Sequence, residues 1–239
     1  MKDFPLQSFY GDIHSTYDRI NRIFTFGQDR TWRRKAVLEL LRMQPDRVLD
    51  LCTGTGDFIL EVAREAGNDK KLVGYDFSPD MLELALDKYR KLGEREQICP
   101  VEFLEGDAGA MPFEEGSFDA LGITFGIRNL VYQNSKANQH LREINRVLRR
   151  GGHLVVLESS RPENSLWSLF NSLYLRFILP YLGGLISGNL KAYKYLANSS
   201  KNYYTMREMA KILETAGFEV ANSRSLFLGS VMLLVLEKK

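Results

Sequence analysis

The chain has 239 residues, of which 44% are apolar and 26% charged, and this composition is typical of a globular protein with a sizeable core. Its formal net charge of +2 provides no electrostatic basis for nucleic-acid binding, so we exclude a nucleic-acid partner. Cys52 and Cys99 have no metal-ligand spacing and suggest no disulfide framework, and residues 1–10 lack the apolar core of a signal peptide. We therefore expect no metal site and a cytoplasmic location.

Strand and helix patterns alternate through the first two thirds of the chain. Helical patterns precede residue 46, and apolar strand patterns follow in four places. Ser78 and Pro79 form a helix start signal between the second and third strands. The predicted strands cover residues 47–51, 71–75, 101–104 and 118–124. Such alternation predicts an α/β fold with a mostly parallel, Rossmann-like sheet covered by helices on both faces.

The last third begins with a helix, for which we expect Gly151-Gly152 to be the stop signal. A fifth strand is predicted over 153–157, and two helical segments then interrupt the alternation between 160 and 200. A helix ending at Gly217 leads to two last strands, which are predicted over 219–227 and 230–236. Only two residues separate these strands, so they can pair only as an antiparallel hairpin. The prediction is therefore one domain over 1–239, with an N-terminal helical lid (1–45) and an inserted helical cap (160–200).

The most informative motif is the glycine turn at residues 48–57, which read VLDLCTGTGD. The turn follows an apolar strand and opens a helix, and Asp76 follows it at the end of the next strand, where an acid can bind ribose hydroxyls. Ile59 replaces the third glycine of a dinucleotide fingerprint, and no Lys-Ser or Lys-Thr pair is present. The motif therefore favours adenosine without a pyrophosphate and disfavours an NAD oxidoreductase. The candidate ligand-binding residues of this turn are Thr53, Gly54, Thr55 and Gly56.

Further candidates follow from the topology, because ligands of open α/β sheets bind at the carboxyl ends of the strands. Phe77 is placed to pack on an adenine face, and Asp107 is placed to bind the adenine amino group. Ala108 and Thr124 lie at the ends of the third and fourth strands. Asp50 is expected to order the glycine turn through hydrogen bonds rather than to contact a substrate.

The chain resembles the menaquinone and ubiquinone biosynthesis C-methyltransferases, a family within the class I S-adenosylmethionine-dependent methyltransferases. The most selective motifs are TFGIRN at residues 124–129 and YDRIN at residues 17–21. Further segments that fit the family are 26–27 (FG), 32–33 (WR), 157–162 (LESSRP), 193–199 (YKYLANS) and 216–218 (AGF). The resemblance implies S-adenosylmethionine as cofactor and a prenylated quinol as substrate, with demethylmenaquinol placed first. The resemblance also implies that the cofactor-contacting positions of the family correspond to Thr55, Asp76, Asp107, Ala108 and Thr124.

Methylation at carbon requires an electron-rich ring, so the protein must stabilise a quinolate. Arg128 is the expected group, because a guanidinium is permanently charged and its planar fork can hold an aryl oxide. The other reading of Arg128 is a structural salt bridge. Asn129 is expected to fix the second ring oxygen, and Tyr17 is expected to accept a proton, with His14 as the weaker candidate. His140 and His153 are assigned no role.

Three alternatives stay open at this point: a ubiquinol precursor as substrate, another small aromatic or lipophilic substrate, and a cofactor-binding subunit without catalysis. Three departures from the family pattern bear on the substrate, namely Tyr203-Tyr204, Leu233-Leu234 and His14.

Residues 166–186 are strongly apolar but contain Arg176 and Pro180, so we reject a membrane-spanning helix there. A cap helix, an apolar substrate entrance and a peripheral contact with the inner face of a membrane all fit this segment. Its aromatic residues are expected to be core packing rather than a ligand site; they are Phe170, Tyr174, Phe177 and Tyr181. The sequence also allows a homodimer.

Overall fold

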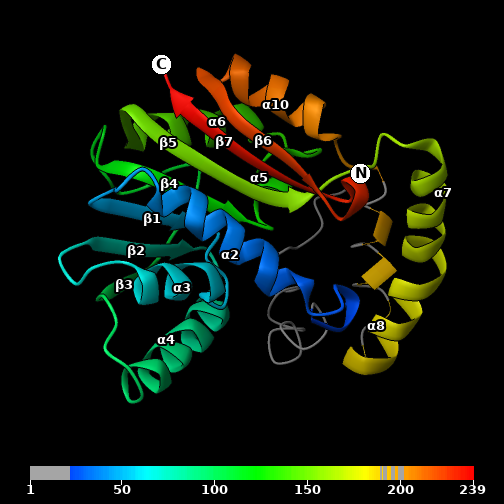
Figure 1. The fold of residues 1–239 in the computed structure, drawn as a ribbon, viewed down its shortest axis with the longest axis horizontal. Helices are drawn as coiled ribbons and strands as arrows, with labels where there is room; N and C mark the ends of the chain where they lie inside the picture. The colour runs from blue at the N-terminus through cyan, green and yellow to red at the C-terminus, as the bar shows by residue number, and fades with distance from the viewer. Residues whose placement is uncertain (1–21, 189, 191–192, 195–196, 199–201) are drawn as a thin grey trace.

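The computed structural model describes residues 22–188, 190, 193–194, 197–198 and 202–239, and within them it contains one seven-stranded sheet (Figure 1). The strands are β1 (Arg47–Leu51), β2 (Lys71–Asp76), β3 (Val101–Glu105), β4 (Phe118–Thr124), β5 (Leu148–Ser159), β6 (Phe218–Leu226) and β7 (Val231–Lys238). Their order is β3-β2-β1-β4-β5-β7-β6. The strands β1 to β5 pair in parallel, whereas β7 is antiparallel to both β5 and β6. The predicted parallel sheet with an antiparallel end hairpin is confirmed.

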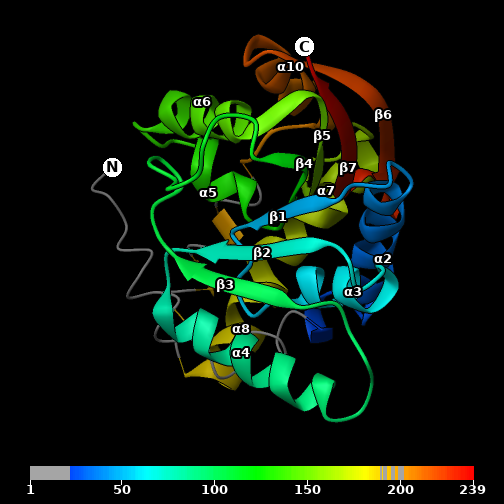
Figure 2. The same cartoon turned by 90° about the vertical axis from the view of Figure 1, so that its left-hand side faces the viewer.

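Helices cover both faces of the sheet (Figure 2). Those on the body of the protein are α2 (Gln28–Leu41), α3 (Asp57–Glu65), α4 (Pro79–Gly93), α5 (Ile127–Val131), α6 (Ala137–Val147) and α10 (Met206–Thr215). The helices α2 and α3 pack on one face and α5, α6 and α10 on the other, while α4 flanks β3 at the edge. The Ser78 hydroxyl accepts from the Met81 amide at the start of α4, which confirms the predicted cap.

The two faces bury two separate apolar cores, because neighbouring residues of a strand point to opposite sides of the sheet. Leu49 of β1 lies in the core beneath α5, α6 and α10, while its neighbour Val48 lies in the core beneath α2 and α3. Trp32 and Val37 bring α2 into that second core. Both faces of β1, β2 and β4 are therefore buried, as their mostly apolar sequences require, whereas β3 at the edge of the sheet is partly exposed. Residues 1–21 of the predicted lid lie outside the described residues.

The start of β5 differs from the prediction. The preceding helix α6 ends at Val147, and Leu148 already pairs with Phe118 of β4, so Gly151-Gly152 lie inside the strand. The register between β4 and β5 shifts here, and a Cβ on Gly152 would lie 2.8 Å from the Arg149 carbonyl oxygen. The glycines therefore mark a bulge and a close backbone approach rather than a helix stop.

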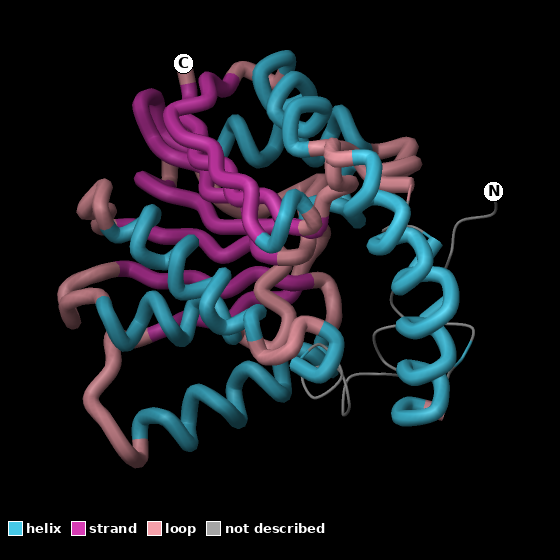
Figure 3. Tube along the Cα trace, turned by 45° about the vertical axis from the view of Figure 1, so that its right-hand side comes forward, coloured by secondary structure: helices cyan, strands magenta, loops and turns pink. Residues whose placement is uncertain are grey.

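A helical arm follows β5 and consists of α7 (Ser165–Leu173), the π-helical turn η1 (Tyr174–Ile178) and α8 (Leu179–Ser187) (Figure 3). Pro180 does not break the arm, because it lies in the first turn of α8, directly after the π turn. The prediction of aromatic core packing here is wrong for Phe170, Phe177 and Tyr181, each more than half exposed. Among the described residues, no helix has both the length and the apolar content to cross a bilayer.

Candidate functional site

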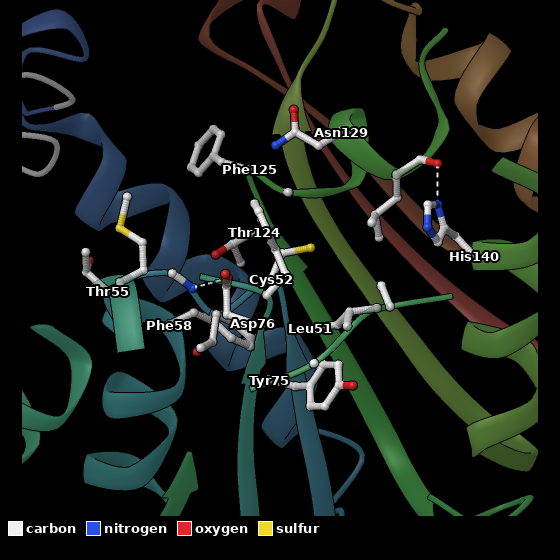
Figure 4. Close-up of a pocket in the computed structure, with 18 of the residues that line it drawn as sticks. Leu51, Cys52, Thr55, Phe58, Tyr75, Asp76, Thr124, Phe125, Asn129 and His140 are labelled. Atoms are coloured by element: carbon white, nitrogen blue, oxygen red, sulfur yellow. Dashed lines mark hydrogen bonds between the residues drawn. The ribbon is translucent and has the colours of Figure 1, made fainter. Parts of the chain in front are cut away.

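The carboxyl ends of β1, β2, β3 and β4 meet at one edge of the sheet and surround a cavity of about 480 Å³ (Figure 4). This volume is in the range of small-molecule sites. Eight of the nine residues predicted to bind the cofactor line it, and they come from all four strand ends: Thr53, Gly54, Thr55, Asp76, Phe77, Asp107, Ala108 and Thr124. The predicted convergence of distant loops is therefore present in the fold.

The two glycines of the turn have different roles. Gly54 lines the cavity with φ +55°, and a Cβ built on it would meet no other described atom within 4 Å. Gly56, with φ +80°, is the ninth predicted residue and is absent from the described lining. A Cβ on Gly56 would lie 3.0 Å from the Cβ of Ala85 in α4. Gly56 therefore permits close packing of two helices, while Gly54 leaves space for a ligand.

Two buried carboxyl groups hold the glycine turn. Asp76 accepts hydrogen bonds from the amides of Gly54 (2.8 Å, Figure 4) and Ser78 (3.0 Å). Asp50 is fully buried and its Oδ2 accepts from the Thr53 hydroxyl at 2.5 Å. Burial raises the pKa of Asp76, and burial raises the pKa of Asp50 to about 7. The bond to Thr53 agrees with the predicted role of Asp50 in ordering the turn.

A charged network forms one rim of the cavity. The Arg33 guanidinium contacts Asp29 at 2.9 Å and Asp57 at 3.5 Å, and it lies 5.5 Å from the ring centroid of Phe125. Lys88 donates to Asp57 at 2.5 Å and to the Thr55 hydroxyl at 2.8 Å. Burial opposes ionisation of Asp57, but Arg33 and Lys88 outweigh it and lower the pKa of this carboxyl. This network was not predicted from the sequence, although the WR motif at 32–33 included Arg33.

The opposite rim is formed by Asp107 and by His140, for which no role was predicted from the sequence. Asp107 accepts from the Gly109 amide at 2.8 Å and from Lys136 at 3.3 Å, and these contacts lower the pKa of its carboxyl. His140 lines the cavity, and its Nδ1 lies 2.8 Å from the Leu130 carbonyl oxygen (Figure 4). Because a carbonyl only accepts, Nδ1 carries the proton. The other nitrogen, Nε2, lies 3.9 Å from the Asp107 carboxylate.

The floor between β1 and β4 contains two strained residues. Cys52 and Phe125 have φ values of +60° and +57°, which non-glycine residues rarely adopt, and both line the cavity. Backbones are tight there, because a Cβ on Gly126 would lie 2.4 Å from the Cβ of Cys52. Strain of this kind persists where the surrounding structure enforces it, and it gathers at functional sites.

The predicted catalytic residues are placed differently from one another. Asn129 lines the cavity, whereas Arg128 is 9% exposed and is not part of the lining formed by the described residues. The Arg128 amide donates to Glu158 at the end of β5 (3.3 Å). Tyr203 lies beside them: burial and Glu158 raise the pKa of its phenol, and Arg128 opposes this rise. Tyr17 and His14 lie outside the described residues.

Comparison with known proteins places these features in a family context. The model of the ubiE/COQ5 methyltransferase family matches residues 1–236. A relative named demethylmenaquinone methyltransferase from Thermus thermophilus is 42% identical over 88% of this chain and 91% of its own length. A relative named ubiquinone/menaquinone biosynthesis C-methyltransferase from Geotalea uraniireducens is 38% identical over 90% of this chain and 88% of its own.

Solved structures agree on the fold. An SAM-dependent methyltransferase from Thermotoga maritima superposes with a TM-score of 0.63 at 20% identity, over 98% of this chain and 99% of that one. Another from Aquifex aeolicus has a TM-score of 0.56 at 20% identity, with 80% of each chain covered. At such identities the likeness concerns the fold alone.

Proposed function

Because this chain belongs to the ubiE/COQ5 methyltransferase family, we propose that it methylates a ring carbon of a prenylated quinol with S-adenosylmethionine, demethylmenaquinol being the first candidate. The curated names of its relatives support this substrate class. The observation that carries the proposal is the convergence of four strand ends on one cavity that holds eight of the predicted cofactor residues. A ubiquinol precursor is the second candidate, because the relative at 38% identity carries both quinones in its name.

The open space and the hydrogen-bond acceptors of the cavity fit S-adenosylmethionine. The open space above Gly54 lets a ligand approach the backbone, which a side chain there would prevent. The Asp76 carboxylate, at the end of β2, is the proposed acceptor for ribose hydroxyls, while Phe77 and Ala108 would flank the adenine. Asp107 keeps acceptor capacity besides its bonds to Gly109 and Lys136, so it can take the adenine amino group.

When bound, the cofactor supplies an activated methyl group on a positively charged sulfur, so the protein has mainly to align the substrate and exclude water. The quinol must lose a hydroxyl proton to place negative charge on the ring carbon that accepts the methyl. We assign stabilisation of that oxyanion to Arg128, and orientation of the second ring oxygen to Asn129 in the cavity wall. The ring then loses its own proton to restore aromaticity. Tyr17 stays the proposed acceptor of the hydroxyl proton.

Methyl transfer to a panel of reduced naphthoquinols and benzoquinols tests the proposal, with isotopically labelled cofactor and calorimetric measurement of cofactor affinity. We expect Arg128→Ala to bind the cofactor within about twofold of the wild type and to lose about 100-fold or more in turnover. The control is Arg64→Ala, because Arg64 is half exposed on α3 and pairs only with surface acids in the described structure.

Each alternative has its own outcome in this assay. Product from benzoquinols alone would move the substrate to a ubiquinol precursor. Cofactor binding without product from any quinol would favour either a different small substrate or a non-catalytic subunit. Absence of cofactor binding by the wild type would overturn the proposal as a whole.

We also propose a cytoplasmic protein that contacts the inner face of a membrane peripherally at residues 166–186. The free thiols of Cys52 and Cys99 support a reducing compartment. A homodimer stays a prediction of the sequence, which sedimentation equilibrium of the full chain tests.

A further inference from the structure

The helical arm, defined as α7, η1 and α8, presents a continuous apolar stripe to the outside. Its exposed side chains recur every three or four residues at Leu166, Phe170, Leu173 and Phe177, and again about two helical turns later at Leu185, which is 85% exposed. This spacing keeps them on one side of a helical segment that is mostly α-helical with one π turn. We name these five residues the outer stripe. Monomeric proteins rarely leave so many large apolar side chains exposed side by side without a binding role.

The opposite side of the arm is fixed to the body. Leu175 and Leu179 are more than nine-tenths buried. The Tyr174 hydroxyl donates to the Phe24 carbonyl at 3.0 Å, and the Trp167 indole donates to the Ser230 hydroxyl at 2.9 Å. The outer stripe is therefore presented by an anchored element. The stripe is exposed although the arm that carries it has tertiary contacts with the body.

The charge in and around the arm indicates the kind of partner. From residue 164 to residue 206 the sequence has no Asp or Glu but four cations, namely Arg176, Lys191, Lys194 and Lys201. The Arg176 guanidinium lies 5.2 Å from the ring centroid of Phe177, and the Lys194 ammonium lies 6.0 Å from that of Tyr181. Cations therefore lie directly beside exposed rings. Apolar and aromatic side chains flanked only by cations match a bilayer interface with anionic headgroups.

The position of the arm relates this surface to the site. The arm lies on the side of the molecule toward which the parallel strands point their carboxyl ends (Figure 1), the same edge that holds the cavity. A prenyl tail long enough to partition into lipid would start from that side. This step rests on the proposed function, whereas the apolar stripe and its charge do not.

We propose that the outer stripe of the arm docks on the surface of an anionic phospholipid bilayer. The apolar side chains enter the boundary between headgroups and acyl chains, and Arg176 and Lys194 lie at the level of the lipid phosphates. None of the described helices of the arm qualifies as a membrane span, and Leu175 and Leu179 on its inner side are buried against the body, so the contact is interfacial and reversible. A second copy of the chain is the competing occupant, and the test distinguishes it.

The experiment is co-sedimentation of the full chain with sucrose-loaded vesicles, without cofactor or quinol, so that its outcome does not depend on methyl transfer. Vesicles of phosphatidylcholine alone are compared with vesicles containing about one third phosphatidylglycerol. We expect tight binding to the anionic vesicles only, and weaker binding as salt rises. The double variant F177S/L185S should lose at least tenfold in partitioning.

Two further variants separate the apolar from the electrostatic contribution. R176Q should lose about fivefold on anionic vesicles, which corresponds to one basic residue at the surface, and nothing on neutral ones. L38S is the matched control, because Leu38 is an exposed leucine of α2 that lies outside the arm, and it should bind like the wild type. Circular dichroism and thermal unfolding check that each variant is folded.

Two results would overturn the proposal. The first is F177S/L185S partitioning like the wild type while it is folded. The second is a wild-type dimer in sedimentation equilibrium that dissociates in F177S/L185S, because the outer stripe would then be an interface between copies. If the vesicle result holds and no quinol is methylated, the docking surface stands and the proposed function fails.

Discussion

The glycine turn offers the sharpest test of the site, because Gly54 and Gly56 lie two residues apart and differ in what surrounds them. Both have positive φ, so replacement by alanine costs each about 1 kcal/mol in backbone strain. Gly54→Ala adds a methyl group to open cavity space, whereas Gly56→Ala adds one 3.0 Å from the Cβ of Ala85. Overpacking of this kind typically costs a further 1–3 kcal/mol.

The two variants should therefore lose different properties, Gly54→Ala mainly cofactor affinity and Gly56→Ala mainly stability. We expect Gly54→Ala to lower the free energy of unfolding by about 1 kcal/mol, a loss of about 2–4 °C in Tm for a chain of this size. Its affinity for S-adenosylmethionine should fall at least tenfold, which corresponds to about 1.4 kcal/mol. Gly56→Ala should lose about 2–4 kcal/mol of stability and, below its Tm, keep its cofactor affinity within about twofold.

Calorimetric titration with S-adenosylmethionine at 15 °C measures the affinity, and thermal unfolding without ligand measures the stability. This prediction assigns one glycine to the ligand and the other to helix packing. It is refuted if Gly54→Ala binds the cofactor as tightly as the wild type, or if Gly56→Ala is the variant that loses affinity while it remains folded.

The remaining predictions concern the buried polar groups. Because burial raises the pKa of Asp50 from 3.8 to about 7, the folded state holds more protons than the unfolded state between these values, and stability falls as pH rises through them. Between pH 5 and pH 8 the wild type should therefore lose about 2–3 kcal/mol of stability that Asp50→Asn keeps, as measured by urea unfolding at both pH values; parallel profiles would contradict this. Both carboxylate oxygens of Glu158 accept from backbone N–H groups, Oε2 from Arg128 and Oε1 from Ser159, so Glu158→Gln must set an NH2 donor against one of these N–H groups. We expect at least a tenfold loss of turnover with cofactor affinity unchanged in calorimetry. The Tyr203 hydroxyl is buried without a hydrogen-bond partner in the described structure, so Tyr203→Phe should unfold at the same temperature or a few degrees higher; a large loss in Tm would mean that the hydroxyl is bonded.

Sequence periodicity was sufficient for the order of elements, because period-two and period-3.6 patterns depend only on which faces are buried. The strand over residues 118–124 was predicted with its observed bounds for this reason. Conversely, the start of β5 was wrong because Gly151-Gly152 signal either a helix end or a bulge. Only the pairing of Leu148 with Phe118 decides between them. Local signals therefore fail where a distant strand selects among several local conformations.

The same limit applies to the site. Residues at strand ends could be predicted, since parallel strands bring their carboxyl ends to one edge whatever the side chains are. The roles of Gly56 and His140 could not be predicted, because they depend on neighbours that are distant in sequence. Ala85 lies against Gly56, and Asp107 faces His140. The exposure of Phe177 was missed for a further reason. An apolar helical stripe is the same pattern whether it faces a core or a lipid surface.

The departures from the family pattern differ in their bearing on the substrate. Leu233 and Leu234 are at most 1% exposed within β7, where each packs into one of the two cores, and neither lines the cavity formed by the described residues. A change there alters packing. Tyr203 is equally buried and does not line the described cavity either, but its phenol interacts electrostatically with Glu158 and with Arg128, the residue proposed to stabilise the quinolate. Any narrowing of quinol preference relative to other members of the family is therefore to be sought at Tyr203 rather than in the last strand.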